Sequence, residues 1–193
     1  SLRVVTPRGI VASRRLPGSG AGPSPDRMFI GSEGILGIIT EAWMRLQDRP
    51  RWRASASVSF KDTLAGAEAV RAISQSGLAP TNCRLLDPGE AMTAGAGAGD
   101  AAILVIGFES ADHRPDAWMA RTLELCRDHG GVVADVAGAT RDDESGGREG
   151  AVGAWRSSFL RAPYGRDALV RMSVIVETFE TACTWDAFPA LHA

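Results

Sequence analysis

Three glycines at a spacing of three and one carboxylate stand directly before an apolar run in this sequence. The stretch "MFIGSEGILGIIT", residues 28–40, carries Gly31, Gly34 and Gly37 with Glu33 among them. Glycine has no side chain, so such a backbone can turn tightly or lie close to another group. The spacing matches neither the G-x-G-x-x-G dinucleotide pattern nor a P-loop. Two alternatives stay open: a tight turn that lets a strand pack on a neighbouring backbone, or a surface for a ligand.

Other side chains with catalytic or ligating chemistry form no recognisable pattern. Glu177 and Glu180 are three residues apart, so on one strand they would point to opposite faces, and a solvated edge or a salt bridge is their usual role. The cysteines are odd in number and lack CxxC spacing, and the histidines lack ligand spacing. We therefore predict no metal site and no disulfide framework. The residues concerned are Cys83, Cys126, Cys183, His113, His129 and His192.

Length, composition and charge narrow the class of protein. With 193 residues and 45% hydrophobic residues, the chain can bury a core. A formal net charge of −2 gives no field that would attract nucleic acid, so we expect a small-molecule partner. No apolar run approaches the roughly 20 residues of a membrane span, and no signal peptide opens the chain. These features favour a soluble protein in a reducing, cytoplasmic compartment.

The first quarter of the chain predicts a small β structure. Two β-branched runs pair across Pro7-Arg8-Gly9 as a hairpin over residues 2–16. Residues 17–26 are rich in glycine and proline and predict a loop. The apolar stretch 35–46 predicts a strand that is buried on both faces. Residues 47–53 have the composition of a domain boundary.

The rest of the chain predicts an α+β domain. Strand, helix, strand, strand, helix, strand is the ferredoxin-like split βαβ order, in which two helices cover one face of an antiparallel sheet. The helical spacing places Leu64, Ala67, Val70 and Ile73 on one helix face, and Met119, Leu123 and Cys126 on another. The predicted strands are 53–60, 81–87, 101–110 and 132–137, with helices over 61–77 and 116–131 and a short helix with a loop between 88 and 100.

Three further segments follow this domain. Residues 140–150 are polar, acidic and rich in glycine, and predict a loop. Residues 151–170 predict a helix that is broken at Pro163. Residues 172–185 predict one more strand.

The string "GSEGILGIIT" preceded by "PDRMFI" resembles a segment of the flavin-binding domain of the vanillyl-alcohol-oxidase-like FAD enzymes. The resemblance implies that FAD is the cofactor and that this segment runs along its adenosine and pyrophosphate half. The physics agrees, since bare backbone amides can approach a flat ring or a pyrophosphate, and an apolar strand excludes water. The implied cofactor-binding residues are Glu33, Gly34, Ile35, Leu36, Gly37, Ile38 and Ile39.

Three more strings narrow the resemblance. "TNCRLLD" (81–87), "WRSSFLRAPYGRDAL" (155–169) and "VIVETFETACTWD" (174–186) resemble the cap domain of the alkyldihydroxyacetonephosphate synthases. The resemblance implies that the chain is a fragment of a longer enzyme. Residues 1–49 would then be the C-terminal part of its FAD-binding domain, and residues 50–193 a cap (substrate) domain that is incomplete at its C-terminus.

The sequence also departs from this family. Ile35 stands where threonine is commonest, Gly165 replaces a bulkier residue, and "TACTW" replaces "SAPW". The GSEG string is shared by D-lactate and glycolate dehydrogenases. The exact substrate is therefore left open.

Two arginines take roles from the resemblance. The arginine of "PY-x-RD" corresponds to Arg166 and would bind the substrate's phosphate, and Arg84 would be the catalytic-site arginine that affects activity. A guanidinium suits both roles, because its fork of donors grips phosphate or carboxylate in two bonds. The alternative is that both are structural ion pairs, Arg84 with Asp87 or Glu109, and Arg166 with Asp167.

The resemblance implies a reaction as well. FAD N5 would bond covalently to acyl-dihydroxyacetone phosphate, the fatty acid would leave and a fatty alcohol would replace it, with no net redox change. The first alternative is an FAD-dependent 2-hydroxy-acid dehydrogenase of the D-lactate or glycolate type, and a second is a non-enzymatic ligand-sensing or interaction module. Tyr164 receives no catalytic role. The partner would be a small phosphate or carboxylate, while a homodimer and peripheral membrane contact stay open.

Overall fold

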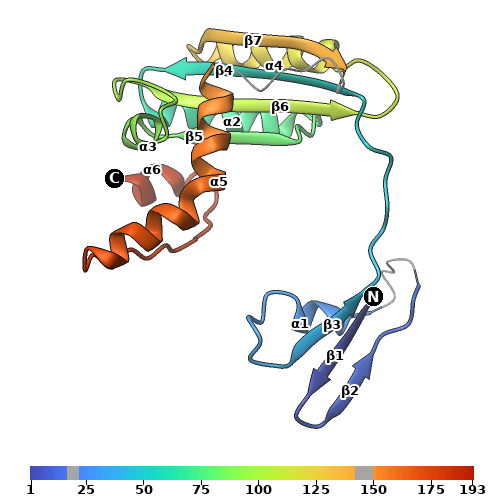
Figure 1. The fold of residues 1–193 in the computed structure, drawn as a ribbon. Coiled ribbons are helices and arrows are strands. Elements are labelled where there is room, and N and C mark those ends of the chain that lie inside the picture. The colour runs from blue at the N-terminus through green and yellow to red at the C-terminus, as the bar shows by residue number, and fades with distance from the viewer. Residues whose placement is uncertain (17–21, 142–149) are drawn as a thin grey trace. The chain divides into compact units, whose positions relative to one another are not determined.

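The computed structural model describes residues 1–16, 22–141 and 150–193, which form two compact units, Ser1–Asp48 and Arg49–Ala193 (Figure 1). The division falls within the stretch 47–53 that has the composition of a boundary. That the first unit is part of an FAD-binding domain stays a prediction.

The first unit is a three-stranded antiparallel sheet in the order β2-β1-β3. β1 (Leu2–Thr6) and β2 (Gly9–Ala12) form the predicted hairpin, in which Thr6 lies opposite Gly9. A short helix that the sequence did not predict, α1 (Asp26–Phe29), precedes the glycines. Residues 17–21 of the predicted 17–26 loop lie outside the described residues.

The third strand of this unit corrects one prediction. β3 spans Ile38–Ala42 rather than 35–46, and all of its side chains are exposed rather than buried. It pairs only with β1, and no helix or second sheet in the described part of this unit covers its faces. The apolar side chains of β3 favour burial, but a three-stranded sheet by itself has no second layer to bury them.

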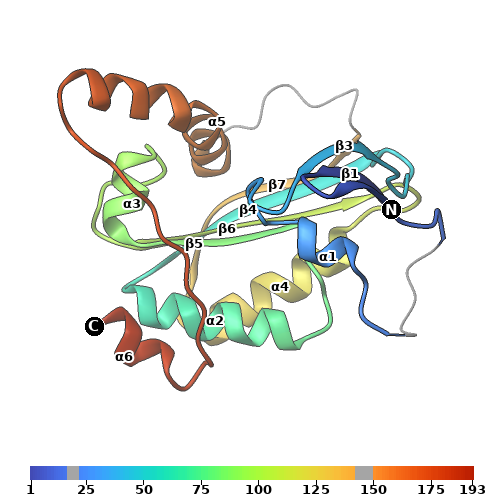
Figure 2. The ribbon, with the colours of Figure 1, turned by 90° about the horizontal axis from the view of Figure 1, so that it is seen from below.

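The second unit has the predicted ferredoxin-like arrangement. Its four strands are antiparallel in the order β5-β6-β4-β7, which confirms the α+β fold class. Figure 2 shows α2 and α4 on one side of the sheet and α5 on the other. In chain order the elements are β4 (Trp52–Phe60), α2 (Thr63–Gln75), β5 (Asn82–Leu86), α3 (Pro88–Thr93), β6 (Ala102–Ser110), α4 (Asp116–Asp128) and β7 (Val132–Arg141).

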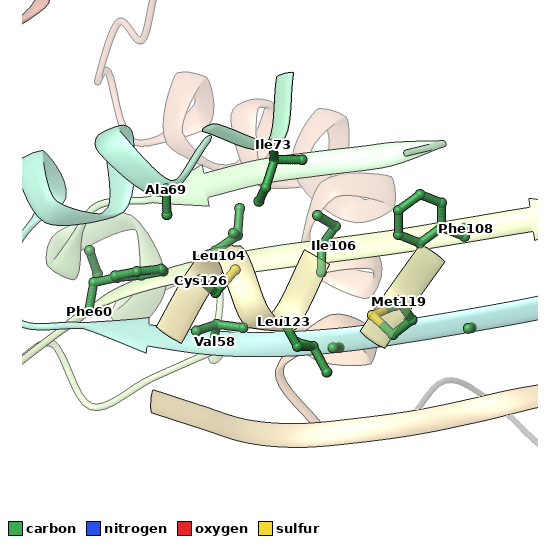
Figure 3. Close-up of a cluster of buried hydrophobic side chains, with 13 residues drawn as sticks. Val58, Phe60, Ala69, Ile73, Leu104, Ile106, Phe108, Met119, Leu123 and Cys126 are labelled. Carbon is green, nitrogen blue, oxygen red and sulfur yellow. The ribbon is translucent and has the colours of Figure 1, made fainter. Parts of the chain in front are cut away.

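The core lies between the sheet and the two helices α2 and α4. β4 and β6 pair along nine residues, from Trp52 opposite Ser110 to Phe60 opposite Ala102. Alternate residues of both strands point to the helices, as in Figure 3, because side chains of a strand alternate between faces. The cluster is Ala54, Ala56, Val58, Phe60, Ala69, Ile73, Ala102, Leu104, Ile106, Phe108, Met119, Leu123 and Cys126.

The predicted helix face is confirmed in α4 and only partly in α2, where Val70 is half-buried. Met119, Leu123 and Cys126 of α4 are all buried, as predicted. In α2 the predicted Ala67 and Ile73 are buried, whereas Leu64 in the first turn is 42% exposed. That helix begins at the N-cap Asp62, whose carboxylate accepts a hydrogen bond from the backbone N–H of Ala65 at 2.8 Å.

A second, smaller cluster occupies part of the opposite face of the sheet. It joins α3 and the first turn of α5 to the end of β5 and the first half of β6. Its buried residues are Leu86, Ala91, Ile103, Val105 and Val152, with Trp155 packed against them.

Two predictions for the C-terminal part are wrong. α5 (Gly150–Arg171) continues through Pro163, and Figure 1 shows its axis changing direction along its length. Proline removes one backbone hydrogen bond and bends a helix, but neighbouring turns can hold the helix together. Residues 172–185 form no strand, because no strand in the described residues pairs with them, and Ile175 is 93% exposed.

The chain ends in a short helix, α6 (Phe188–His192), that the sequence did not predict. The predicted 140–150 loop falls mainly on residues outside those described. Within the described ranges, every helix is too short or too polar to cross a lipid bilayer.

The three thiols differ in exposure, and this difference predicts their reactivity. Burial raises the pKa of the Cys83 thiol to about 11 and that of Cys126 to about 12, whereas Cys183 is exposed. The thiolate is the reactive form, so at about pH 8 a maleimide should modify Cys183 quickly, and the other two only after denaturation. Peptide mass spectrometry of labelled native and denatured protein measures this. Rapid labelling of Cys126 in the native protein would contradict the packing described.

Candidate functional site

The predicted site residues lie in both units. Residues 33–39 belong to the first unit, and Arg84 and Arg166 belong to the second.

The glycine segment is a series of tight turns with left-handed backbone. Gly31, Glu33 and Gly34 have φ angles of +82°, +50° and +87°. The N–H of Ser32 donates to the carbonyl of Phe29 at 3.2 Å, and the N–H of Ile35 donates to that of Ser32 at 3.0 Å. Because a left-handed conformation costs an L-residue about 1–2 kcal/mol, glycine is favoured at two of these positions and Glu33 is strained.

Gly34 and Gly37 lack a side chain for different reasons. A Cβ on Gly37 would lie 2.7 Å from the carbonyl oxygen of Val5 and 2.9 Å from Val4 Cγ1, so this glycine lets β3 pack on β1. A Cβ on Gly34 would meet only Ile38 Cδ1, at 4.0 Å. The packing alternative therefore explains Gly37, while the space above Gly34 is open to a ligand.

The surface around Gly34 has the chemistry that a flat cofactor needs. Ile35 is 85% exposed and Ile38 is 63% exposed, and Leu36 and Ile39 are also exposed. β3 lies at the edge of its sheet, so its outer N–H and C=O groups have no strand partner in the described residues. Apolar side chains beside unpaired backbone donors fit the predicted FAD, whose rings are apolar and whose pyrophosphate accepts hydrogen bonds.

Arg84 is held by two groups from other elements. It lies on β5, and its Nη2 donates to Glu90 Oε1 of α3 at 2.8 Å. Its Cζ lies 5.6 Å from the centre of the Trp155 ring of α5. The sequence suggested Asp87 or Glu109 as structural partners, and both are engaged elsewhere.

Asp87 and Glu109 have other partners, which explains why Arg84 pairs with Glu90 instead. Asp87 caps α3, since its Oδ1 accepts from the backbone N–H of Glu90 at 2.8 Å. Glu109 pairs with Arg53 at 2.8 Å, directly across from it in the β4–β6 ladder. Sequence reasoning missed Glu90, although Asp87-Pro88-Gly89-Glu90 has the spacing of a capping box, which places an acid in the first turn of a helix.

Arg166 lies in the second half of α5 and is exposed. It makes no ion pair or hydrogen bond with any described residue, so the alternative pairing with Asp167 is absent. Eleven positions separate it from Trp155, about 16 Å of helix. The structure therefore does not bring Arg166 next to Arg84.

The remaining candidates stay on the surface. Glu177 and Glu180 are exposed in an irregular segment, so the argument from opposite strand faces does not apply to them. Tyr164 is 75% exposed. His113 contacts Ser110 and Asp112, and hydrogen bonds from His113 and then Ser110 hold the pKa of Asp112 below its ordinary value.

A cavity of about 320 Å³ lies between the start of α2 and the C-terminal segment that includes Trp185 and the first residues of α6. None of the predicted site residues lines it. Its walls are Lys61, Asp62, Leu64, Ala65, Ala67, Glu68, Trp185, Phe188 and Pro189. Among the described residues, no group of three histidine, cysteine, aspartate or glutamate side chains is placed to hold a metal ion.

Comparison with known proteins identifies the family. Residues 49–193 match the model of the C-terminal domain of FAD-linked oxidases. The chain belongs to this family. FAD is thus the cofactor of the family, as the glycine segment predicted, and the homologues are enzymes.

The relatives include alkyldihydroxyacetonephosphate synthases and D-lactate dehydrogenases. The chain is 38% identical over 90 residues to an alkyldihydroxyacetonephosphate synthase of Dictyostelium discoideum, which is 47% of this chain and 15% of that protein. It is 39% identical over 89 residues to a mitochondrial D-lactate dehydrogenase [cytochrome] of Arabidopsis thaliana, covering 45% of this chain and 16% of that one. A probable D-lactate dehydrogenase of Danio rerio is 29% identical over 187 residues, covering 86% and 35%.

A solved alkyldihydroxyacetonephosphate synthase has the same fold. It superposes on 98% of this chain with a TM-score of 0.72 at 23% identity, and the chain covers 38% of it. The chain thus spans a minor part of the proteins that it resembles. These relatives leave open whether the reaction is a transfer or an oxidation.

The contrast between Gly34 and Gly37 predicts two different defects. In the full-length protein, Gly34→Val should lower bound flavin severalfold, because the branched side chain fills the open space and opposes a φ of +87°. Gly37→Ala should instead destabilise the fold, since its Cβ would clash with β1.

Flavin absorbance per mole of protein and a thermal melt measure the two effects. Full flavin content in Gly34→Val, at an unchanged melting temperature, would remove this position from the cofactor site.

Proposed function

We propose that this chain is part of an FAD-dependent enzyme that exchanges the acyl group of acyl-dihydroxyacetone phosphate for a fatty alcohol. FAD is the cofactor of the family to which the chain belongs. The sequence strings around Arg84 and Arg166 resemble those of the alkyldihydroxyacetonephosphate synthases. The observation that carries the proposal is the exposed guanidinium of Arg166, which has no partner among the described residues. An unpaired guanidinium in such an enzyme is suited to the substrate's phosphate.

In this proposal, different residues of the chain bind the cofactor and the substrate. Residues 33–39 bind the cofactor through backbone amides and exposed apolar side chains. Arg166 binds the phosphate and so orients the substrate, and Arg84 presents further donors from the sheet. FAD, when bound, supplies the covalent chemistry of the exchange.

A second candidate is oxidation of a 2-hydroxy acid. The matches to D-lactate dehydrogenases of Arabidopsis thaliana and Danio rerio favour it. A guanidinium grips a carboxylate with the same two-pronged geometry as a phosphate, so either arginine could bind such a substrate. A non-enzymatic module is disfavoured because the homologues are enzymes.

Turnover by the full-length protein distinguishes these reactions. With acyl-dihydroxyacetone phosphate and a fatty alcohol, we expect the ether product to form without any electron acceptor. Mass spectrometry of the lipid product measures it. Oxidation of D-lactate or glycolate that requires an acceptor dye, without ether formation, would favour the dehydrogenase, and protein lacking flavin after growth with ample riboflavin would favour the non-enzymatic module.

Arg166 provides a direct test of substrate binding. In the full-length protein, Arg166→Lys should lower kcat/KM about tenfold to a hundredfold, because lysine keeps the charge but loses the two-pronged grip. Arg166→Ala should lower it further. Flavin content and melting temperature should stay nearly unchanged, since Arg166 is exposed and makes no ion pair or hydrogen bond with described residues.

Arg161→Lys is the matched control, because Arg161 is another exposed arginine of α5. This control should keep wild-type kinetics. Unaltered kinetics in Arg166→Ala would remove Arg166 from the site, and a lowered melting temperature with modest kinetic change would make it a structural residue.

A further inference from the structure

We propose that Glu90 and Trp155 are positioning residues that hold the guanidinium of Arg84 in one orientation toward the substrate. The inference rests on the proposed function, because it assumes that Arg84 acts on the substrate of this enzyme.

Arg84 by itself is poorly constrained. β5 is an edge strand, and Arg84 lies opposite Val105 of β6. Its neighbours Cys83 and Leu85 pack against the cluster under α2 and α4, so Arg84 points to the other face of the sheet, as Leu86 does. A long side chain at a half-exposed edge has many rotamers, and ordering it carries an entropic cost.

Glu90 supplies a fixed acceptor. Its backbone lies in the first turn of α3, where its N–H donates to the Asp87 cap at 2.8 Å. The next residue, Ala91, is fully buried in the second cluster and anchors this turn to the sheet. The carboxylate oxygen 2.8 Å from Arg84 Nη2 is thus attached to a rigid element.

The ring of Trp155 provides a flat aromatic surface beside the guanidinium of Arg84. α5 is anchored to the same cluster by Val152, which is 7% exposed, and the Trp155 ring packs against the cluster. Phe159 stacks on the Trp155 ring, with centroids 5.6 Å apart and planes 27° apart, and restricts its rotation. The Arg84 Cζ lies 5.6 Å from the centre of the Trp155 ring, within the range of a cation–π contact.

The two contacts leave part of the guanidinium available. Glu90 accepts from Nη2, while Nε and Nη1 of Arg84 donate to no acceptor within the described parts of the chain. A guanidinium carries five N–H donors in a planar fork. The free side of that fork can bind an oxyanion in two bonds, and its direction is set by groups from α3 and α5.

A purely structural ion pair is the competing explanation. Side chains of Arg84 and Glu90 are 44% and 39% exposed, and such pairs contribute little to stability. Arg121 and Glu124 of α4 form a comparable exposed pair, also at 2.8 Å, far from any predicted site residue in the sequence. Glu124→Gln is therefore a matched control for Glu90→Gln.

The test uses the full-length flavoenzyme and whichever of the two reactions the wild type catalyses. Glu90→Gln should lower kcat/KM about tenfold, with flavin content and melting temperature as in Glu124→Gln, which should keep wild-type kinetics. Trp155→Leu should also lower kcat/KM, and Trp155→Phe should restore most of it because an aromatic face is kept.

A double variant shows whether Glu90 acts through Arg84. If it does, Arg84→Lys with Glu90→Gln should lose no more activity than Arg84→Lys alone, because the positioned group is already lost. Additive losses would overturn the inference, as would wild-type kinetics in Glu90→Gln.

Failure of the underlying assumption gives a different pattern. Wild-type kinetics in Arg84→Lys would remove Arg84 from the site and overturn its assigned role together with the inference. A large loss in Arg84→Lys with none in Glu90→Gln would overturn the inference alone. Ether formation by the wild type is judged separately, so failure of the proposed reaction remains distinguishable from both.

Discussion

The pairing of β4 with β6 is the constraint on which the second unit depends. Nine residues of each strand lie opposite one another, and along β4 apolar side chains alternate with arginine and serine. A shift of one residue would exchange the faces of a strand and place serines in the core. Once this register is set, Phe60, Leu104 and Phe108 must face α2 and α4. The same register leaves Arg53 directly opposite Glu109.

The two faces of the four-stranded sheet therefore have different roles. One face buries a continuous apolar cluster under two helices and supplies most of the hydrophobic stabilisation. In the described part of the chain, the buried apolar cluster on the other face lies where α3 and α5 begin, and its residues are anchors for Glu90 and Trp155. A charged side chain such as Arg84 can therefore lie beside rigid elements without being buried itself.

The sequence correctly predicted the features that depend on the spacing of residues within a single element. The period-two and helical spacings gave the split βαβ order and the buried face of α4, because each records burial within a single element. The exposure of β3, the missing strand at 172–185 and the continuity of α5 through Pro163 depend on partners elsewhere in space, and the sequence carries no local sign of them. For the same reason Arg84 could be selected as a candidate, whereas its contacts with Glu90 and Trp155 could not.

The register of β4 and β6 also affects how the chain folds during synthesis. The partners are separated by roughly 40 to 60 residues of intervening chain, so their contact closes a long loop. At about 5 to 20 residues per second, β4 leaves the ribosome roughly 3 to 10 seconds before β6 follows. During that interval α2, the next element in the chain, can cover the apolar side of β4. The amphipathic face of α2 is therefore available to shield a nascent strand before it becomes part of a finished core.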